Sequence, residues 1–151
     1  MLGLRVLIIA AFCVVGSLQD TPFTKCKAGG PAPEALRVKG CNTTPCRFVK
    51  GKDVEAEWDF NVVADAEALK PVVKAKALGI TVDYPLPEQD ACKSLVNGEC
   101  PLEKGELVSY GLRMPILKAY PKVDLHLTFF LVDPQKNVHV CFEIDAKVVD
   151  N

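Results

Sequence analysis

Side chains that could carry acid–base chemistry are few in this chain. It contains only two histidines, His126 and His139. His126 alternates with Asp124 and Thr128, which places these three side chains on one face of an extended segment. Such a row is typical of a solvated strand face, and the chain has no nucleophile elbow, phosphate-binding glycine loop or HExxH motif. We therefore predict a protein that is not an enzyme and has no catalytic residues, metal or cofactor.

The number of cysteines indicates which covalent chemistry this chain undergoes. The chain has seven cysteines, and Cys13 lies in the apolar run from Val6 to Val15, just after Arg5. A charged residue, a short apolar run and small residues after it are typical of a signal peptide. We predict a signal peptide over residues 1–19 and a secreted domain over residues 20–151, whose remaining cysteines pair as disulfides.

Local spacing favours one of the fifteen pairings that six cysteines allow. The two short intervals join Cys41 to Cys46 and Cys92 to Cys100, which leaves Cys26 with Cys141. The last bridge would tie the two ends of the domain together, and chain-entropy arguments assign it roughly 4–5 kcal/mol. Metal binding by these thiols is the weaker alternative, because the chain has no CxxC pair and the compartment is oxidising.

Charge and length restrict the possible partners. The formal net charge of −1 argues against nucleic acid or an anionic membrane surface as the main partner. The length corresponds to one domain, and we expect a monomer that is secreted or extracellular, with the lysosome as an alternative destination. Asn42-Thr43-Thr44 is a glycosylation sequon, so we expect Asn42 on an exposed loop.

The elements that position these residues are predicted to be strands. Apolar and polar residues alternate from Asp53 to Val62, and again in the segments that end at Met114, Leu131 and Ala146. A period of two indicates a strand with one buried and one solvated face. About seven short antiparallel strands with almost no helix predict an all-β, immunoglobulin-like β-sandwich.

One stretch departs from simple alternation. The apolar set is Val73, Ala75 and Ala77 before Gly79, and Ile80, Val82 and Tyr84 after it. We interpret this phase change as a β-bulge at Leu78-Gly79 within one strand. Pro85 ends the strand, because proline lacks a backbone donor. The apolar connection that follows is where we expect the lip of an apolar pocket.

Several short runs resemble the ML-domain lipid-recognition family. They are Cys46-Arg47-Phe48-Val49-Lys50-Gly51, Tyr84-Pro85-Leu86-Pro87-Glu88-Gln89-Asp90-Ala91-Cys92-Lys93-Ser94, Tyr120-Pro121 and Cys141-Phe142-Glu143-Ile144, together with the cysteine spacing. The resemblance covers residues 26–149 and extends to the soluble lysosomal sterol carriers of that family. It implies an immunoglobulin-like sandwich with an apolar pocket between its sheets, and the disulfide pairing given above.

The resemblance also implies a set of ligand-binding residues. Tyr84, Ile116 and Tyr120 would form the entrance, with Phe129 and Phe142 deeper inside. The full expected set is Trp58, Phe60, Ala77, Val82, Tyr84, Met114, Ile116, Tyr120, Pro121, Leu127, Phe129 and Phe142. At the entrance we expect the Tyr84 hydroxyl to stay hydrated.

By resemblance, the function is that of a carrier that binds one apolar ligand, a sterol in the first place, and transfers it. Ala77, Phe129 and Phe142 are smaller than the family residues they match, so a fatty acid or semiochemical is the alternative ligand.

Two kinds of protein partner are implied. The family docks to a membrane sterol transporter beside the mouth, where Leu78, Gly79 and Ile80 keep an apolar patch. The alternative is a lipid-presenting co-receptor module of innate immunity that docks to a receptor. Asp83, Glu88 and Asp90 would make the mouth acidic, which favours the carrier.

Overall fold

The computed structural model describes residues 20–151, so the predicted signal peptide lies outside the described residues. Ten strands and one short 3-10 helix build the domain. They are β1 (Thr24–Lys25), β2 (Ala35–Val38), β3 (Cys46–Val49), β4 (Asp53–Asn61), β5 (Lys70–Ala77), β6 (Ile80–Tyr84), η1 (Ala91–Ser94), β7 (Leu95–Asn97), β8 (Leu107–Pro115), β9 (Asp124–Val132) and β10 (Val138–Val149).

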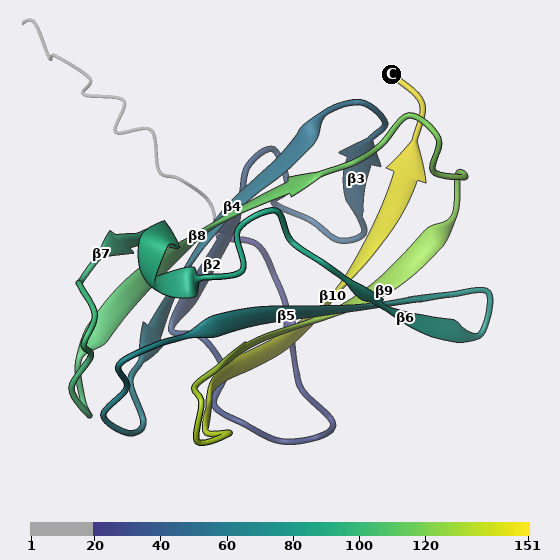
Figure 1. Ribbon diagram of the computed structural model, residues 1–151. Helices are drawn as coiled ribbons and strands as arrows, with labels where there is room; N and C mark the ends of the chain where they lie inside the picture. Colours follow the sequence, from purple (N-terminus) through teal and green to yellow (C-terminus); the bar gives the residue numbers. More distant parts are fainter. Residues whose placement is uncertain (1–19) are drawn as a thin grey trace, which may run out of the picture.

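The strands form two sheets that face each other as a sandwich (Figure 1). The larger sheet has the order β1-β10-β9-β5-β6, with β3 also paired to β10, and the smaller sheet has the order β2-β4-β8-β7. The all-β sandwich prediction is confirmed. One pairing differs from the prediction, because β3 runs parallel to β10, whereas β1 pairs antiparallel with the earlier part of the same long strand.

The strand count differs from the prediction for two reasons. Strands β1 and β7 have only two and three residues, too few for an alternating pattern to be recognised. In addition, the segment predicted as one strand with a β-bulge is a hairpin of β5 and β6. Its turn is Leu78-Gly79, and both residues have positive φ, 51° and 77°, as a two-residue type I′ turn requires.

The pairing within this hairpin explains the phase change in the sequence. Val73 lies opposite Tyr84, and Ala75 lies opposite Val82. Directly opposed residues share a face of the sheet, so the apolar sets before and after Gly79 lie on the same side. The bulge interpretation was therefore wrong, whereas the grouping of these side chains on one face was right.

The core lies between the sheets, where the alternating residues meet. The inward side chains of β4 and β8, from Val54 to Phe60 and from Val108 to Met114, are buried as predicted. They face Leu127, Phe129 and Leu131 of β9. The three predicted disulfides, Cys26–Cys141, Cys41–Cys46 and Cys92–Cys100, are confirmed. Within residues 20–151, no helix is long and apolar enough to cross a membrane.

The first half of strand β10, from His139 to Ile144, is buried on both faces. Cys141 and Glu143 alternate with Val140 and Phe142, yet all four are enclosed. The segment before β2 covers the second face, because Cys26 is bonded to Cys141 and the Cys141 amide donates to the Pro31 carbonyl at 2.8 Å. An alternation with a period of two predicts one buried face, so it does not predict the burial of the second face of β10.

Candidate functional site

An aromatic cluster occupies the middle of the sandwich interior. Phe129 and Phe142 stack with ring centroids 5.0 Å apart and an interplanar angle of 17°. From the opposite sheet, Trp58 meets Phe142 edge-on at 4.9 Å and lies 5.8 Å from Phe129. Trp58 also contacts Tyr110, its cross-strand neighbour, at 4.6 Å. Both sheets therefore contribute rings to one apolar centre.

Most of the predicted ligand-binding residues line this interior, but not all. The buried ones are Trp58, Phe60, Met114, Ile116, Leu127, Phe129 and Phe142. Ala77, Tyr84 and Tyr120 are half-buried, whereas Val82 and Pro121 are exposed. Val82 is exposed because it lies near the tip of a hairpin that is not covered, and its role in ligand binding stays a prediction. Tyr110 was missed as a member of the cluster, although its inward phase on β8 was clear from the sequence.

Two tyrosines lie at the edge between the sheets, where β6 approaches the end of β8. The Tyr84 hydroxyl donates to the Pro115 carbonyl at 2.5 Å, and the Tyr84 and Tyr120 rings meet edge-on at 6.4 Å. Burial, together with the Tyr120 hydroxyl, raises the pKa of Tyr84 above its usual value. The sequence did not indicate this backbone acceptor, and the hydration of the Tyr84 hydroxyl stays a prediction. We call Tyr84, Pro115 and Tyr120 the tyrosine edge.

The tip of the β5–β6 hairpin presents apolar side chains to solvent. Leu78, Ile80 and Val82 are 88%, 66% and 56% exposed. Lys74 and Asp83 form an exposed ion pair on the other face of the same hairpin, at 3.0 Å. Large exposed apolar side chains gathered on one element are typical of a contact surface. We call Leu78, Ile80 and Val82 the hairpin tip.

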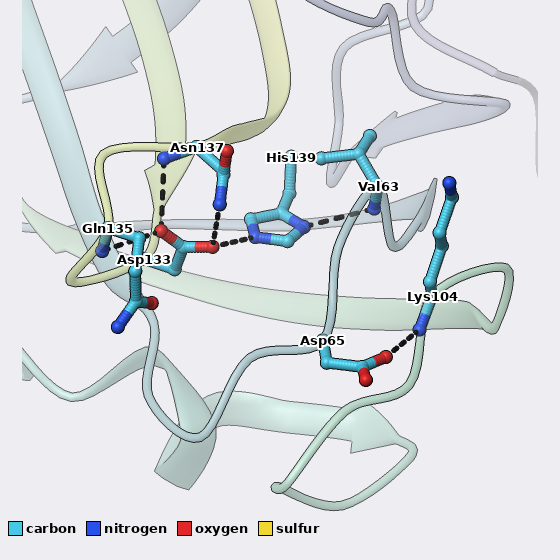
Figure 2. Close-up of polar contacts among 7 residues, drawn as sticks. All are labelled: Val63, Asp65, Lys104, Asp133, Gln135, Asn137 and His139. Carbon is cyan, nitrogen blue, oxygen red and sulfur yellow. Dashed lines mark hydrogen bonds and ion pairs between the residues drawn. The ribbon is translucent and has the colours of Figure 1, made fainter.

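A buried polar cluster holds the turn between β9 and β10 (Figure 2). The Asp133 carboxylate accepts from the Asn137 side chain at 2.9 Å and from the backbone amides of Gln135 and Asn137. It also meets His139 Nε2 at 2.9 Å, while His139 Nδ1 accepts from the Val63 amide at 3.2 Å. Figure 2 shows the His139 ring between Asp133 and the connection that follows β4.

These contacts fix the protonation pattern of the cluster. Since Nδ1 accepts from Val63, Nε2 carries the proton and donates to Asp133. Burial alone would raise the pKa of Asp133, but the hydrogen bonds from Asn137 and His139 outweigh burial and hold that pKa below its ordinary value. We call Val63, Asp133, Asn137 and His139 the histidine end. The sequence identified the turn from Asp133 to Asn137 but not the burial of His139.

The other polar features lie on outer faces of the sandwich. His126 is half-exposed and contacts Asp145 at 2.8 Å and Glu143 at 3.3 Å. Within residues 20–151, no group of three or more His, Cys, Asp or Glu side chains could hold a metal ion. Asn42 is exposed, as predicted, and borders a groove of about 830 Å³ on the outer face of the smaller sheet, next to Arg37 and Arg113.

Charges along that groove are paired. Arg37 donates to both carboxylate oxygens of Asp59, at 2.8 and 3.0 Å, and this contact lowers the pKa of Asp59. Lys39 pairs with Glu55 at 3.1 Å. Paired charges therefore border this groove, which lies on the outside of the sandwich and away from the aromatic cluster.

Comparisons with known proteins agree with this architecture. Residues 20–148 match the sequence profile of the ML domain. The chain is 34% identical over 148 residues to NPC intracellular cholesterol transporter 2 homolog a of Drosophila melanogaster, across 96% of this chain and 99% of the relative.

Two solved structures share the sandwich. The Niemann-Pick type C2 protein from Japanese carpenter ant superposes with a TM-score of 0.74 at 19% identity, across 85% of this chain and 99% of that one. Chicken MD-1, crystallised with lipid IVa, superposes with a TM-score of 0.55 at 17% identity, across 82% of this chain and 85% of that one. Because the ML-domain profile matches almost the whole described domain, this chain belongs to the ML-domain family.

Proposed function

We propose that this protein is a carrier that binds one sterol between its two sheets and transfers it, outside the cell or in the lysosome. The observation that carries the proposal is the apolar interior, whose rings come from both sheets and which borders the half-buried tyrosine edge. The relative in Drosophila melanogaster is named as a cholesterol transporter. A non-catalytic role agrees with that name.

Ligand entry requires the rings to move apart, because Trp58, Phe129 and Phe142 are in mutual contact. The tyrosine edge is the favoured route, since the Tyr84–Pro115 hydrogen bond contributes only about 1 kcal/mol. Burying about 400 Å² of ligand surface at about 25 cal/mol/Å² gives on the order of 10 kcal/mol gross. Lost ligand freedom offsets several kcal/mol of that gain, which leaves about micromolar affinity or tighter.

The hairpin tip is the proposed contact with a membrane sterol transporter that accepts the ligand. Exposed Ile80 and Val82 lie on the strand that ends at Tyr84, and exposed Leu78 lies in the turn before it. A partner seated there would contact the element that forms one side of the mouth. Replacing both Leu78 and Ile80 by Ser should leave ligand binding unchanged and slow transfer to acceptor membranes. Slower transfer only when a receptor is present would favour the co-receptor alternative.

The test of the carrier is ligand uptake by a matched pair of variants. Ile116 is buried, whereas its neighbour Leu117 is 52% exposed. Ile116→Asp would place an unpaired charge in an apolar site and should lower cholesterol uptake at least tenfold, whereas Leu117→Asp should leave uptake unchanged. Circular dichroism verifies the fold of both variants. Equal uptake by the two variants would place the ligand elsewhere.

A competition experiment between sterols and fatty acids tests which class of lipid the protein binds. Secreted protein is freed of lipid, loaded with a fluorescent sterol and challenged with cholesterol, a plant sterol and long-chain fatty acids, with native mass spectrometry to verify that one ligand is bound. Displacement by sterols and not by fatty acids is the expected result. The reverse order would replace the sterol with a fatty acid or semiochemical, and uptake of neither class would overturn the carrier.

A further inference from the structure

Trp58 combines complete burial with a polar atom that has no partner. Its side chain is 1% exposed and lies between the sheets, with Tyr110 beside it and the rings of Phe129 and Phe142 opposite. Among the described residues 20–151, the indole nitrogen Nε1 of Trp58 is the only buried side-chain nitrogen or oxygen atom that has no hydrogen-bond partner.

An unsatisfied donor in this position has a cost. Leaving a buried N–H without an acceptor costs about 1–3 kcal/mol, and buried indole N–H groups usually find a partner. A phenylalanine would supply an aromatic ring without that cost. The position therefore carries a donor that the closed interior does not use, in the space where the proposed ligand enters.

We propose that the bound lipid presents an oxygen atom to Trp58 Nε1, so that the carrier selects lipids that are oxygenated at their buried end. This inference rests on the proposed carrier function. The indole N–H only donates, so the ligand atom must be an acceptor. An ionised carboxylate is disfavoured, because the neighbouring rings supply no cation and burial of an unpaired charge is costly.

The ligand class that fits is a neutral oxygenated sterol, with a hydroxyl or ketone oxygen at the inner end. Two orientations supply such an oxygen. A sterol with one hydroxyl would enter hydroxyl-first, whereas a sterol that is also oxygenated on its side chain could keep its ring hydroxyl at the tyrosine edge. Tyr84 already donates to Pro115, so the tyrosine edge does not require the ligand to bring an oxygen there.

The presence of a single tryptophan in the chain makes a direct experiment possible. Delipidated ¹⁵N-labelled protein has one indole N–H cross-peak, which is followed while 5α-cholestane, cholesterol or 25-hydroxycholesterol is added from cyclodextrin. An acceptor at Nε1 should move the indole proton downfield, and 5α-cholestane should not. A shift with cholesterol indicates hydroxyl-first entry, and a shift with 25-hydroxycholesterol alone indicates the opposite orientation.

Affinity gives the second readout. The oxygen that moves the cross-peak should tighten binding about tenfold relative to the same sterol without it. In Trp58→Phe this ratio should fall to about one, since the donor is gone. In Phe129→Leu, which removes a ring without a donor, both sterols should weaken and the ratio should persist. The ratio cancels any general loss of packing.

The outcomes separate this inference from the carrier function. Binding of the oxygenated sterols without movement of the cross-peak would overturn the role of Trp58 and leave the carrier intact, as would an unchanged affinity ratio in Trp58→Phe. If Trp58→Phe does not fold, the cross-peak of the native chain decides alone. Absence of binding by cholesterol, 25-hydroxycholesterol and 5α-cholestane alike would overturn the carrier, and the role of Trp58 with it.

Discussion

The histidine end and the tyrosine edge are held together in different ways. At the histidine end, the buried Asp133 carboxylate and the enclosed His139 ring join the β9–β10 turn to the connection after β4. At the tyrosine edge, the hydrogen bond from Tyr84 to Pro115 and one edge-on ring contact join β6 to the end of β8.

The hairpin tip extends this contrast. Lys70 of β5 pairs with Val132 and Lys76 pairs with His126, so the β9–β10 turn and the hairpin tip lie at opposite ends of β5 (Figure 1). A region with few buried polar contacts opens at a lower free energy than a cross-linked one. From this difference we expect the sandwich to open at the tyrosine edge while the histidine end holds the two sheets together.

The largest expected effect is removal of the Cys26–Cys141 bridge, which reaches β10 two residues after His139. This bridge spans 115 residues, whereas Cys92–Cys100 spans 8. Chain-entropy arguments predict losses of about 5 and about 2.5 kcal/mol for paired Cys→Ala changes at the two bridges. Urea unfolding measures both, and an equal or smaller loss for Cys26–Cys141 would contradict the greater stabilisation expected of the bridge that anchors β10 beside His139.

Asp133→Ala should be the next most destabilising change, because it leaves His139 with a buried unpaired donor and removes the acceptor of the half-buried Asn137 side chain. We expect a loss of about 3 kcal/mol in the free energy of unfolding. Asp65 is the matched control, since it also accepts a backbone amide, from Lys104 at 2.8 Å, but is exposed (Figure 2). Asp65→Ala should cost about 1 kcal/mol or less, and a loss equal to that of Asp133→Ala would refute the role of burial.

The histidine end should also respond to acid. The pKa of Asp133 is lower in the folded protein than in the unfolded chain, so its contribution is complete above the unfolded value of about 4 and is lost as the pH falls through the lower folded value. Asp133→Asn should therefore flatten the fall in stability below about pH 4. Urea midpoints measured across this range test the sign, and an unchanged slope would contradict it.

A smaller effect is expected at the tyrosine edge. Tyr84→Phe removes the hydrogen bond to Pro115 and should lower the free energy of unfolding by about 1 kcal/mol. If that bond holds the edge closed, sterol association and dissociation should both accelerate about fivefold, with an almost unchanged Kd. Stopped-flow fluorescence measures the two rates. Unchanged rates would place ligand entry at another edge.

The smallest expected effect is at the hairpin tip, and it has the opposite sign. Leu78 has a φ of 51°, which is unfavourable for a side chain of its size, and Asn-Gly is the pair that a type I′ turn prefers. Leu78→Asn should raise the free energy of unfolding by about 0.5 kcal/mol and slow ligand transfer. Leu78→Val is the control that should lower stability. Faster transfer by the Asn variant would show that the hairpin tip is not part of the surface that contacts the partner.

Much of the interior could be predicted from the sequence. Side chains along a strand alternate between faces, so the pattern from Val54 to Phe60 was sufficient to place Trp58 inside. The disulfide pairing followed from short spacing and was correct. At Leu78-Gly79 the sequence was ambiguous, because a bulge and a two-residue hairpin turn both shift the phase by one, and only the opposition of Val73 and Tyr84 decides between them.

Tertiary structure alone decided which faces are covered. Alternation identifies the side chains that share a face, but what packs on that face comes from distant parts of the chain. His139 is enclosed because the connection after β4 brings the Val63 amide to its ring, whereas Val82 stays exposed because the hairpin tip has no such cover within the described residues. Tertiary structure also determines that the Tyr84 hydroxyl donates to Pro115 and that the Trp58 indole N–H has no acceptor. A hydrogen bond depends on the position of both atoms in space, which the sequence pattern does not give.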